Sequence, residues 1–307
     1  MKKTISKYSY LIALIVVLLS FAFFLITHYL IVMIDPSISL TMAIFFLSSV
    51  LLSAIATTGM LVLNPVLTEA VFISRRMHRF ESLSNPLLVK LSTEAPGTYH
   101  HSMNVSNLAQ KAAKSINADS LLVRTAAYYH DIGKLANPRF YVENQSSLEI
   151  PLDDPAAIQE NVQAIISHVK EGVAIAQKHG IPEGVIDLIA QHHGTTKVVY
   201  FYEKAKEQGI KVKHTDFRYP GPKPLSKEAA ILMLSDSVEA AARALPDLSD
   251  NNIKALVEKT VKERTSDNQL KNAHFTDKEI ATITESLTNS LISIHHQRIQ
   301  YKKNGKR

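Results

Sequence analysis

Seven side chains of two types could together bind metal ions, because they recur on the apolar faces of predicted helices. Imidazole nitrogens and carboxylate oxygens are common ligands of divalent transition metals. The sequence contains 13 His and no Cys, which excludes thiolate zinc sites, iron–sulfur clusters, disulfides and a Cys nucleophile. The seven candidate metal ligands are His101, His130, Asp131, His168, His192, His193 and Asp236.

The helical faces indicate which of these side chains point inward. His101 lies on the apolar stripe of its helix, whereas His100 aligns with polar positions and is expected to face solvent. His168 borders the apolar stripe of a later helix, and Asp236 falls in the middle of another. A carboxylate on a core face is rarely buried without a partner. If Asp236 does not bind a metal ion, Arg243, two turns later, is the alternative partner of its carboxylate.

The set includes two pairs of adjacent residues, of which the His-Asp pair by itself is weak evidence. His192 and His193 turn toward the core at the end of an apolar helix. Two neighbouring imidazoles there are costly unless something binds them, because neither can stay charged cheaply in apolar surroundings. His130 stands next to Asp131, whose two oxygens could bridge two ions. Seven ligands are too many for one tetrahedral zinc and suit two roughly octahedral ions.

The elements that must position these residues are predicted to be helices. Apolar residues recur with helical periodicity, and few stretches alternate with a period of two, so we expect an all-α domain without a central sheet. Loops rich in Pro, Gly, Asn and Asp separate the helices. The predicted helices span residues 67–82, 84–93, 101–117, 119–130, 155–179, 182–193, 197–208, 226–244, 249–264 and 276–299.

Two apolar runs, residues 10–34 and 38–63, precede these helices without a formal charge in either. Each is long enough to cross a hydrocarbon core of about 30 Å. Lysines precede the first run and arginines follow the second, while the turn between them has neither. The positive-inside rule therefore predicts a two-helix transmembrane hairpin in the cell membrane, in contact with lipid, with both termini and the helical domain cytoplasmic. A cleaved signal peptide is the alternative, which the length of the first run disfavours.

The expected organisation is a hairpin over residues 1–66, a linker helix over 67–83, a helical domain over 84–300 and a basic tail over 301–307. The formal net charge is +6, but residues 84–307 contain 28 Lys and Arg against 25 Asp and Glu, a surplus of only +3. This charge is too mild to indicate a nucleic-acid groove, so no nucleic-acid polymer is expected as a partner.

The spaced His and Asp residues resemble the pattern of a known family. His101, followed by His130-Asp131 and Asp236, is similar to the pattern of the HD phosphohydrolase superfamily. His168 with the tandem pair at 192–193 resembles its two-metal branch. The surrounding sequence resembles, more closely still, the membrane-anchored 7TM-HD phosphodiesterases that degrade cyclic di-AMP. The segments that carry this resemblance are residues 94–102, 128–134, 166–170, 191–196 and 217–224.

The resemblance implies an HD-type fold and a metal-dependent phosphodiesterase whose substrate is a cyclic dinucleotide, most closely cyclic di-AMP cut to pApA. It implies iron or manganese as the two divalent ions. A hydroxide bridging the two metals would then attack the phosphorus in line. The implied ligands of one ion are His101, His130, Asp131 and Asp236, and those of the other are Asp131, His168, His192 and His193, with Asp131 bridging.

Basic residues near the metal ligands are candidates for substrate contact. Lys134 lies one turn after Asp131 and could place an ammonium on the phosphate, so these two are the candidate catalytic residues. Arg218, Lys223 and Arg243 are further candidate substrate contacts, for which structural roles are equally compatible with the sequence.

The chain departs from this family in two ways. The family usually has seven spans and a large extracytoplasmic sensor domain, whereas only two apolar runs are found here. The related cyclic di-GMP branch has a Gly-Tyr-Pro motif after its tandem His, and residues 195–200 differ from it, which disfavours that substrate.

Alternatives remain open at this point. The chain could be an HD-type nuclease or nucleotide phosphohydrolase acting on RNA ends, (p)ppGpp or dNTPs. It could also be a non-catalytic, membrane-tethered HD signalling module. The apolar stripe of the helix predicted at residues 276–299 could serve a homodimer or the domain core, and the core is favoured.

Overall fold

The computed structural model describes residues 77–145, 155–210 and 213–300, together with scattered positions between residues 21 and 53. The chain divides into two units, Met1–Arg76 and Met77–Arg307. The elements that position the polar cluster all belong to the second unit. The domain boundaries expected from the sequence stay a prediction.

The regular structure of the described part is helical, as expected, with an isolated antiparallel bridge between Lys197 and Arg218. Short 3-10 helices link the longer ones: η2 (Ile132–Ala136), η3 (Pro138–Phe140), η4 (Val142–Asn144), η5 (His214–Phe217) and η6 (Lys271–Ala273). The α-helices are α3 (Pro86–Glu94), α4 (Pro96–Ser115), α5 (Ser120–Tyr129), α6 (Pro155–Lys178), α7 (Glu183–Gln191), α8 (Val199–Glu207), α9 (Lys227–Arg243), α10 (Asp250–Ser266) and α11 (Asp277–Gln300).

Side-chain caps explain where two of the helices that carry the cluster begin. Ser226 precedes α9, and its hydroxyl accepts a hydrogen bond from the amide of Ala229 at 3.1 Å. Asp119 precedes α5 and accepts hydrogen bonds from the amides of Leu121 and Leu122. Such oxygens satisfy first-turn amides that have no partner within the helix. The caps therefore help to fix which residues of α5 and α9 face the interior.

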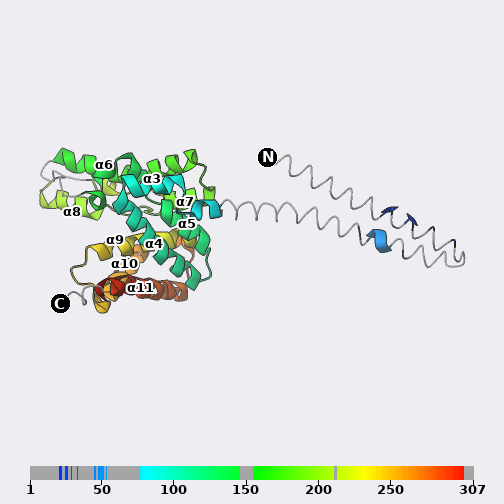
Figure 1. The fold of residues 1–307 in the computed structure, drawn as a ribbon. Coiled ribbons are helices and arrows are strands. Elements are labelled where there is room, and N and C mark those ends of the chain that lie inside the picture. The colour runs from blue at the N-terminus through cyan, green and yellow to red at the C-terminus, as the bar shows by residue number, and fades with distance from the viewer. Residues whose placement is uncertain are drawn as a thin grey trace, which may run out of the picture. The chain divides into compact units, whose positions relative to one another are not determined.

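The core forms where α4 packs against α3, α5, α9 and α11 (Figure 1). Its fully buried side chains include Leu88, Leu108 and Leu232. A smaller apolar cluster, to which Val162 and Phe217 belong, forms around α6, α8 and η5. The polar cluster described below draws on helices of both regions.

The apolar stripe of α11 lies in the main core. Ile283, Leu287 and Leu291 are buried, and Ile280 and Ile294 pack against the same cluster. The stripe that could have served a homodimer is thus covered by its own chain, as the favoured interpretation holds. The homodimer itself stays a prediction.

The expected localisation, a two-span membrane protein with both termini and the helical domain in the cytoplasm, is contradicted. Among the described residues, no helix is long and apolar enough to cross a bilayer. The long helix α6, for example, has exposed charged residues such as Glu160 and Lys170 and is therefore apolar on one face only. The runs at residues 10–34 and 38–63, on which the hairpin and lipid contact were predicted, lie largely outside the described residues.

Candidate metal centre

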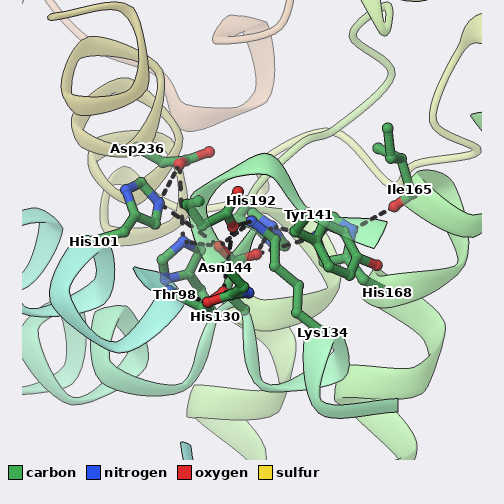
Figure 2. A network of polar contacts seen from close by, with 12 residues as sticks. Thr98, His101, His130, Lys134, Tyr141, Asn144, Ile165, His168, His192 and Asp236 are labelled. Atoms are coloured by element: carbon green, nitrogen blue, oxygen red, sulfur yellow. Dashed lines mark hydrogen bonds and ion pairs between the residues drawn. The ribbon is translucent and has the colours of Figure 1, made fainter. Parts of the chain in front are cut away.

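The structure brings the seven predicted side chains together at one place. Figure 2 shows His101, His130, His168, His192 and Asp236 of this set. Six of them are buried, and the His193 side chain is 23% exposed. They come from five elements: α4 supplies His101, the end of α5 supplies His130 and Asp131, α6 supplies His168, the end of α7 supplies His192 and His193, and α9 supplies Asp236. The sequence prediction of which faces point inward is therefore correct for this set, and His100 is exposed, as its face predicted.

One half of the cluster lies between α4 and α9. The Nε2 atom of His101 lies 3.1 Å from Asp236 Oδ1 and 3.6 Å from Asp131 Oδ2. His130 Nε2 lies 3.3 Å from Asp131 Oδ2 and 3.8 Å from Asp236 Oδ1. Two imidazole nitrogens and two carboxylate oxygens thus converge, which is a donor set suited to a divalent transition metal.

The other half lies on the opposite side of Asp131. Its second oxygen, Oδ1, is 3.3 Å from His168 Nε2 and 3.9 Å from His192 Nε2. Ligand atoms of these three residues and of His193 all lie within 4.8 Å of one another. Because the two oxygens of Asp131 face different groups of histidines, this carboxylate is placed to be shared by two ions.

Three of the histidines have the same backbone arrangement, which determines where their protons lie. In each ring, Nδ1 lies beside the carbonyl oxygen of the residue three positions earlier. A carbonyl only accepts hydrogen bonds, so Nδ1 carries a hydrogen in each ring, and when the ring is neutral its Nε2 presents a lone pair to the cluster. The pairs are His130 with Ala127 at 2.8 Å, His168 with Ile165, and His192 with Ile189 at 2.6 Å.

Glu239, which the sequence analysis did not single out, orients the fourth ring. His101 donates from Nδ1 to Glu239 Oε2 at 2.5 Å, and Asn104 donates to the other carboxylate oxygen at 3.0 Å. Glu239 follows Asp236 by three residues on α9, so both carboxylates share a helical face. The sequence did contain a signal for Glu239, since it is a second acidic residue on the apolar stripe that includes Asp236. Arg243, the structural partner considered for Asp236, is exposed.

The carboxylates make one side of the cluster favourable for positive charge. Burial alone would lower the pKa of His101, but the hydrogen bonds with Asp236 and Glu239 together outweigh it and raise the pKa to about 9. Burial likewise lowers the pKa of His130, and the charge of Asp131 outweighs it and raises the pKa to about 10. The pKa values of Asp131 and Asp236 lie well below the usual range in spite of burial, which by itself would raise them. This side therefore holds protons when no ion is bound, and a metal ion would displace them.

The tandem histidines are held neutral instead. Burial and the charge of His130 lower the pKa of His192 to about 3. Burial holds the pKa of His193 well below its usual value. A neutral imidazole keeps the lone pair that a metal ion requires.

Several buried atoms lack the partner that a metal ion would supply. Among the residues that the structure describes, none is a hydrogen-bond partner of His130 Nε2 or Asp131 Oδ1. The Nε2 atoms of His168 and His192 face each other at 3.2 Å with both lone pairs turned inward. Buried polar groups left in this state are costly. The residues present therefore fit a pair of divalent ions.

A cavity of about 580 Å³ opens onto the cluster. Among the residues that line it, the cations are Lys134, Lys197, Arg243 and Arg264. The aromatic residues that line it are Phe140, Tyr141, Tyr200, Phe201 and Tyr219. Such a wall offers positive charge for phosphates and ring faces for bases.

The candidate substrate contacts are placed differently from one another. Lys134 lines the cavity, with Nζ 2.9 Å from Asp131 Oδ2 and 2.7 Å from Glu143 Oε1. Arg243 also lines it. Arg218 and Lys223 are not among the lining residues described. Arg218 donates to the carbonyl of Thr195 at 2.7 Å, and Lys223 to that of Asn268 at 3.1 Å.

Comparison with known proteins shows close relatives. The HD domain family model matches residues 98–241. Cyclic-di-AMP phosphodiesterase PgpH of Bacillus subtilis (strain 168) is 40% identical over 231 residues, which are 75% of this chain and 32% of that protein. PgpH of Listeria monocytogenes serotype 1/2a (strain 10403S) is 44% identical over 238 residues, 76% of this chain and 33% of that protein. The chain thus spans about a third of the length of these curated relatives.

A solved structure covers the same region. The crystal structure of the L. monocytogenes phosphodiesterase PgpH HD domain in complex with cyclic-di-AMP matches with a TM-score of 0.66 and 44% identity. The match covers 69% of this chain and 99% of that one.

Proposed function

This chain belongs to the HD-domain family, and we propose that it is a metal-dependent phosphodiesterase that opens cyclic di-AMP to linear pApA. The observation that carries the proposal is the position of Asp131, whose two carboxylate oxygens face two different groups of histidines. A pair of metal ions sharing such a bridge is the usual arrangement for cleaving a phosphodiester. The single-metal alternative would leave three inward-facing histidines without a role: His168, His192 and His193.

The choice of substrate is supported by the similarity to a PgpH HD domain whose crystal structure contains cyclic-di-AMP. The cavity supports the same class of ligand, because cations and aromatic rings line it together. Phosphates would meet the cations, and the purine bases would stack on the rings.

Two divalent ions, iron or manganese, would complete the centre. One would be held by His101, His130, Asp131 and Asp236, and the other by Asp131, His168, His192 and His193. Such ions supply a Lewis acid for the phosphate and make water a nucleophile at neutral pH. In the balanced reaction, the oxygen of one water bonds to phosphorus and one P–O3′ bond breaks, leaving a 3′-hydroxyl and a 5′-phosphate.

The chain's own residues hold the substrate in place. Lys134 uses two of its three N–H groups on Asp131 and Glu143, so one N–H remains for a phosphate oxygen. Arg243 lies at the exposed edge of the cavity, where it can meet a phosphate or a base. The positions of Arg218 and Lys223 favour a structural role for both. Arg218 bonds the backbone at Thr195, and Lys223 bonds the backbone at Asn268.

The test is product analysis on the whole chain loaded with iron or manganese. Cyclic di-AMP, cyclic di-GMP, linear pApA and a short RNA are supplied separately, and the metal content is measured in the same preparation. We expect cyclic di-AMP to be converted to pApA. The His130→Ala/Asp131→Ala double variant should lose the metal and turnover but retain its helical circular dichroism.

Other outcomes point to the alternatives. Preference for the RNA would favour a nuclease. A protein that binds cyclic di-AMP without metal and without turnover would favour a signalling module. Either result would overturn the proposed reaction.

A further inference from the structure

Tyr219 is fixed against the candidate metal ligands. Its ring stacks on that of His193, with centroids 4.2 Å apart and an interplanar angle of 23°. It also meets the ring of His168 edge-on at 6.0 Å. The Tyr219 amide donates to the carbonyl of Thr196 at 3.0 Å, so backbone and ring are both held. The residue is 8% exposed and lines the cavity.

The hydroxyl of Tyr219 has no hydrogen bond to any residue that the structure describes. Two other buried tyrosines differ in this respect. Tyr141 donates to the carbonyl of Ala164 at 3.1 Å, and Tyr129 donates to that of Phe80 at 2.9 Å. The Tyr219 oxygen does not belong to the buried polar atoms that lack a partner, so it is open to the cavity that the residue lines. It is therefore available to a ligand bound there.

The local backbone explains why Tyr219, and not its neighbours, reaches the cavity. Residue 218 forms a bridge with Lys197, and the chain is extended there. Successive side chains of an extended chain point to opposite sides. Arg218 accordingly turns toward the carbonyl of Thr195 and toward Asp267, while Phe217 and Tyr219 are buried.

The hydroxyl stays a donor. The ordinary pKa of a tyrosine hydroxyl is about 10, so the group is protonated at neutral pH. A protonated phenol can donate one hydrogen bond to an acceptor. A phosphate oxygen has lone pairs only, and its negative charge makes the hydrogen bond stronger than one to a neutral group.

From this geometry we propose that the Tyr219 hydroxyl donates a hydrogen bond to a non-bridging phosphate oxygen of the substrate, beside His193. This inference rests on the proposed function, since it assumes that a phosphodiester is bound in the cavity. It makes Tyr219 a substrate-contacting residue whose bond strengthens as charge builds on the phosphate oxygens during attack.

The test compares two variants that each remove one hydroxyl. Tyr219→Phe keeps the ring on His193 and loses only the proposed donor. Tyr129→Phe is the matched comparison, because Tyr129 is buried like Tyr219 but donates to the carbonyl of Phe80 and is not among the residues that line the cavity. Both are measured in the full-length, metal-loaded protein, for kcat, KM, metal content and melting temperature.

We expect Tyr219→Phe to lower kcat/KM by about 10- to 100-fold, mainly through kcat, with metal content and melting temperature retained. Tyr129→Phe should lower the melting temperature, because the hydrogen bond to Phe80 is lost, and should change kcat/KM much less. Wild-type kinetics in Tyr219→Phe would overturn the inference. Loss of metal from Tyr219→Phe would also overturn it, because the residue would then act through His193.

A second substrate separates this inference from the identity of the natural one. Bis(p-nitrophenyl) phosphate has the same non-bridging oxygens and no purine. If the wild-type chain cleaves it but not cyclic di-AMP, the proposed substrate is wrong, and the same Tyr219→Phe defect should still appear. If the wild-type chain cleaves neither substrate, both proposals fail.

Discussion

His168 and His192 bring their Nε2 atoms within 3.2 Å of each other, although the Nδ1 atom of each ring already donates to a backbone carbonyl. Neither Nε2 then has a hydrogen to share, so two lone pairs face each other in a buried place. A cation between or beside them removes this repulsion. The folded chain is therefore expected to be more stable with metal than without it.

The first prediction concerns metal removal. Chelation and dialysis should lower the melting temperature by roughly 5–10 °C, because ligands that bind only the folded state stabilise it by mass action. Adding back manganese should restore it. Differential scanning fluorimetry with metal analysis of each sample provides the measurement. The His130→Ala/Asp131→Ala double variant is the control and should not respond to either treatment; an equal response from it would contradict the assignment of the ligands.

The second prediction concerns Glu239, which accepts a hydrogen bond from His101 and so fixes the ring that faces Asp236. Glu239→Ala should weaken metal binding by about 10- to 100-fold, because partners that orient a ligand ring have effects of this size. Titration of the metal-free protein with manganese measures the affinity. The control is Glu258→Ala, an acid on the exposed face of α10 with a side chain 56% exposed. Equal affinities in the two variants would show that Glu239 has no role in the centre.

The sequence alone was sufficient for the seven inward side chains, because each lies on a helical face whose apolar periodicity is visible locally. His101 and Asp236 could be assigned to a core face without knowing which helices meet. Glu239 was missed because its partner, His101, is 138 residues away in sequence. Only the packing of α4 against α9 reveals that pair.

The loop residues show a different limit of the sequence. Arg218 and Lys223 are candidate substrate contacts because of their charge alone. Charge does not determine to which side of an extended chain a side chain points. The structure turns Arg218 toward Asp267 and places the uncharged Tyr219 at the cavity. Periodicity is informative in helices, whereas short irregular segments have no such pattern.

The third prediction concerns Gly133, which allows the turn after Asp131 to approach α6 closely. A Cβ atom at this position would lie 1.8 Å from the carbonyl oxygen of His168 and 2.6 Å from the amide nitrogen of Gly172. Gly133→Ala must therefore move η2 away from α6, which would separate Asp131 from His168. We expect a loss of about 3 kcal/mol or more in the free energy of unfolding, together with a loss of bound metal.

Urea unfolding and metal analysis test this prediction, and Gly184→Ala is the matched control. A Cβ at Gly184 in α7 would meet only a Leu122 methyl at 3.5 Å, an ordinary contact. That change should be neutral or slightly stabilising, because alanine restricts the unfolded chain. If Gly133→Ala were as stable and as metal-rich as Gly184→Ala, the close approach would not matter.

The fourth prediction separates two roles of Lys134, which bonds both Asp131 and Glu143. Lys134→Met should leave the largely buried Glu143 carboxylate without its cation and so lower the free energy of unfolding. Adding Glu143→Gln removes that carboxylate charge, so the double variant should lose less stability than the two single variants predict together. Turnover should behave differently if Lys134 also contacts the phosphate. The single Lys134→Met variant and the double variant should both have a kcat/KM at least tenfold below that of the wild-type chain. Glu143→Gln alone should keep most of the activity. Recovery of turnover in the double variant would assign Lys134 a structural role only.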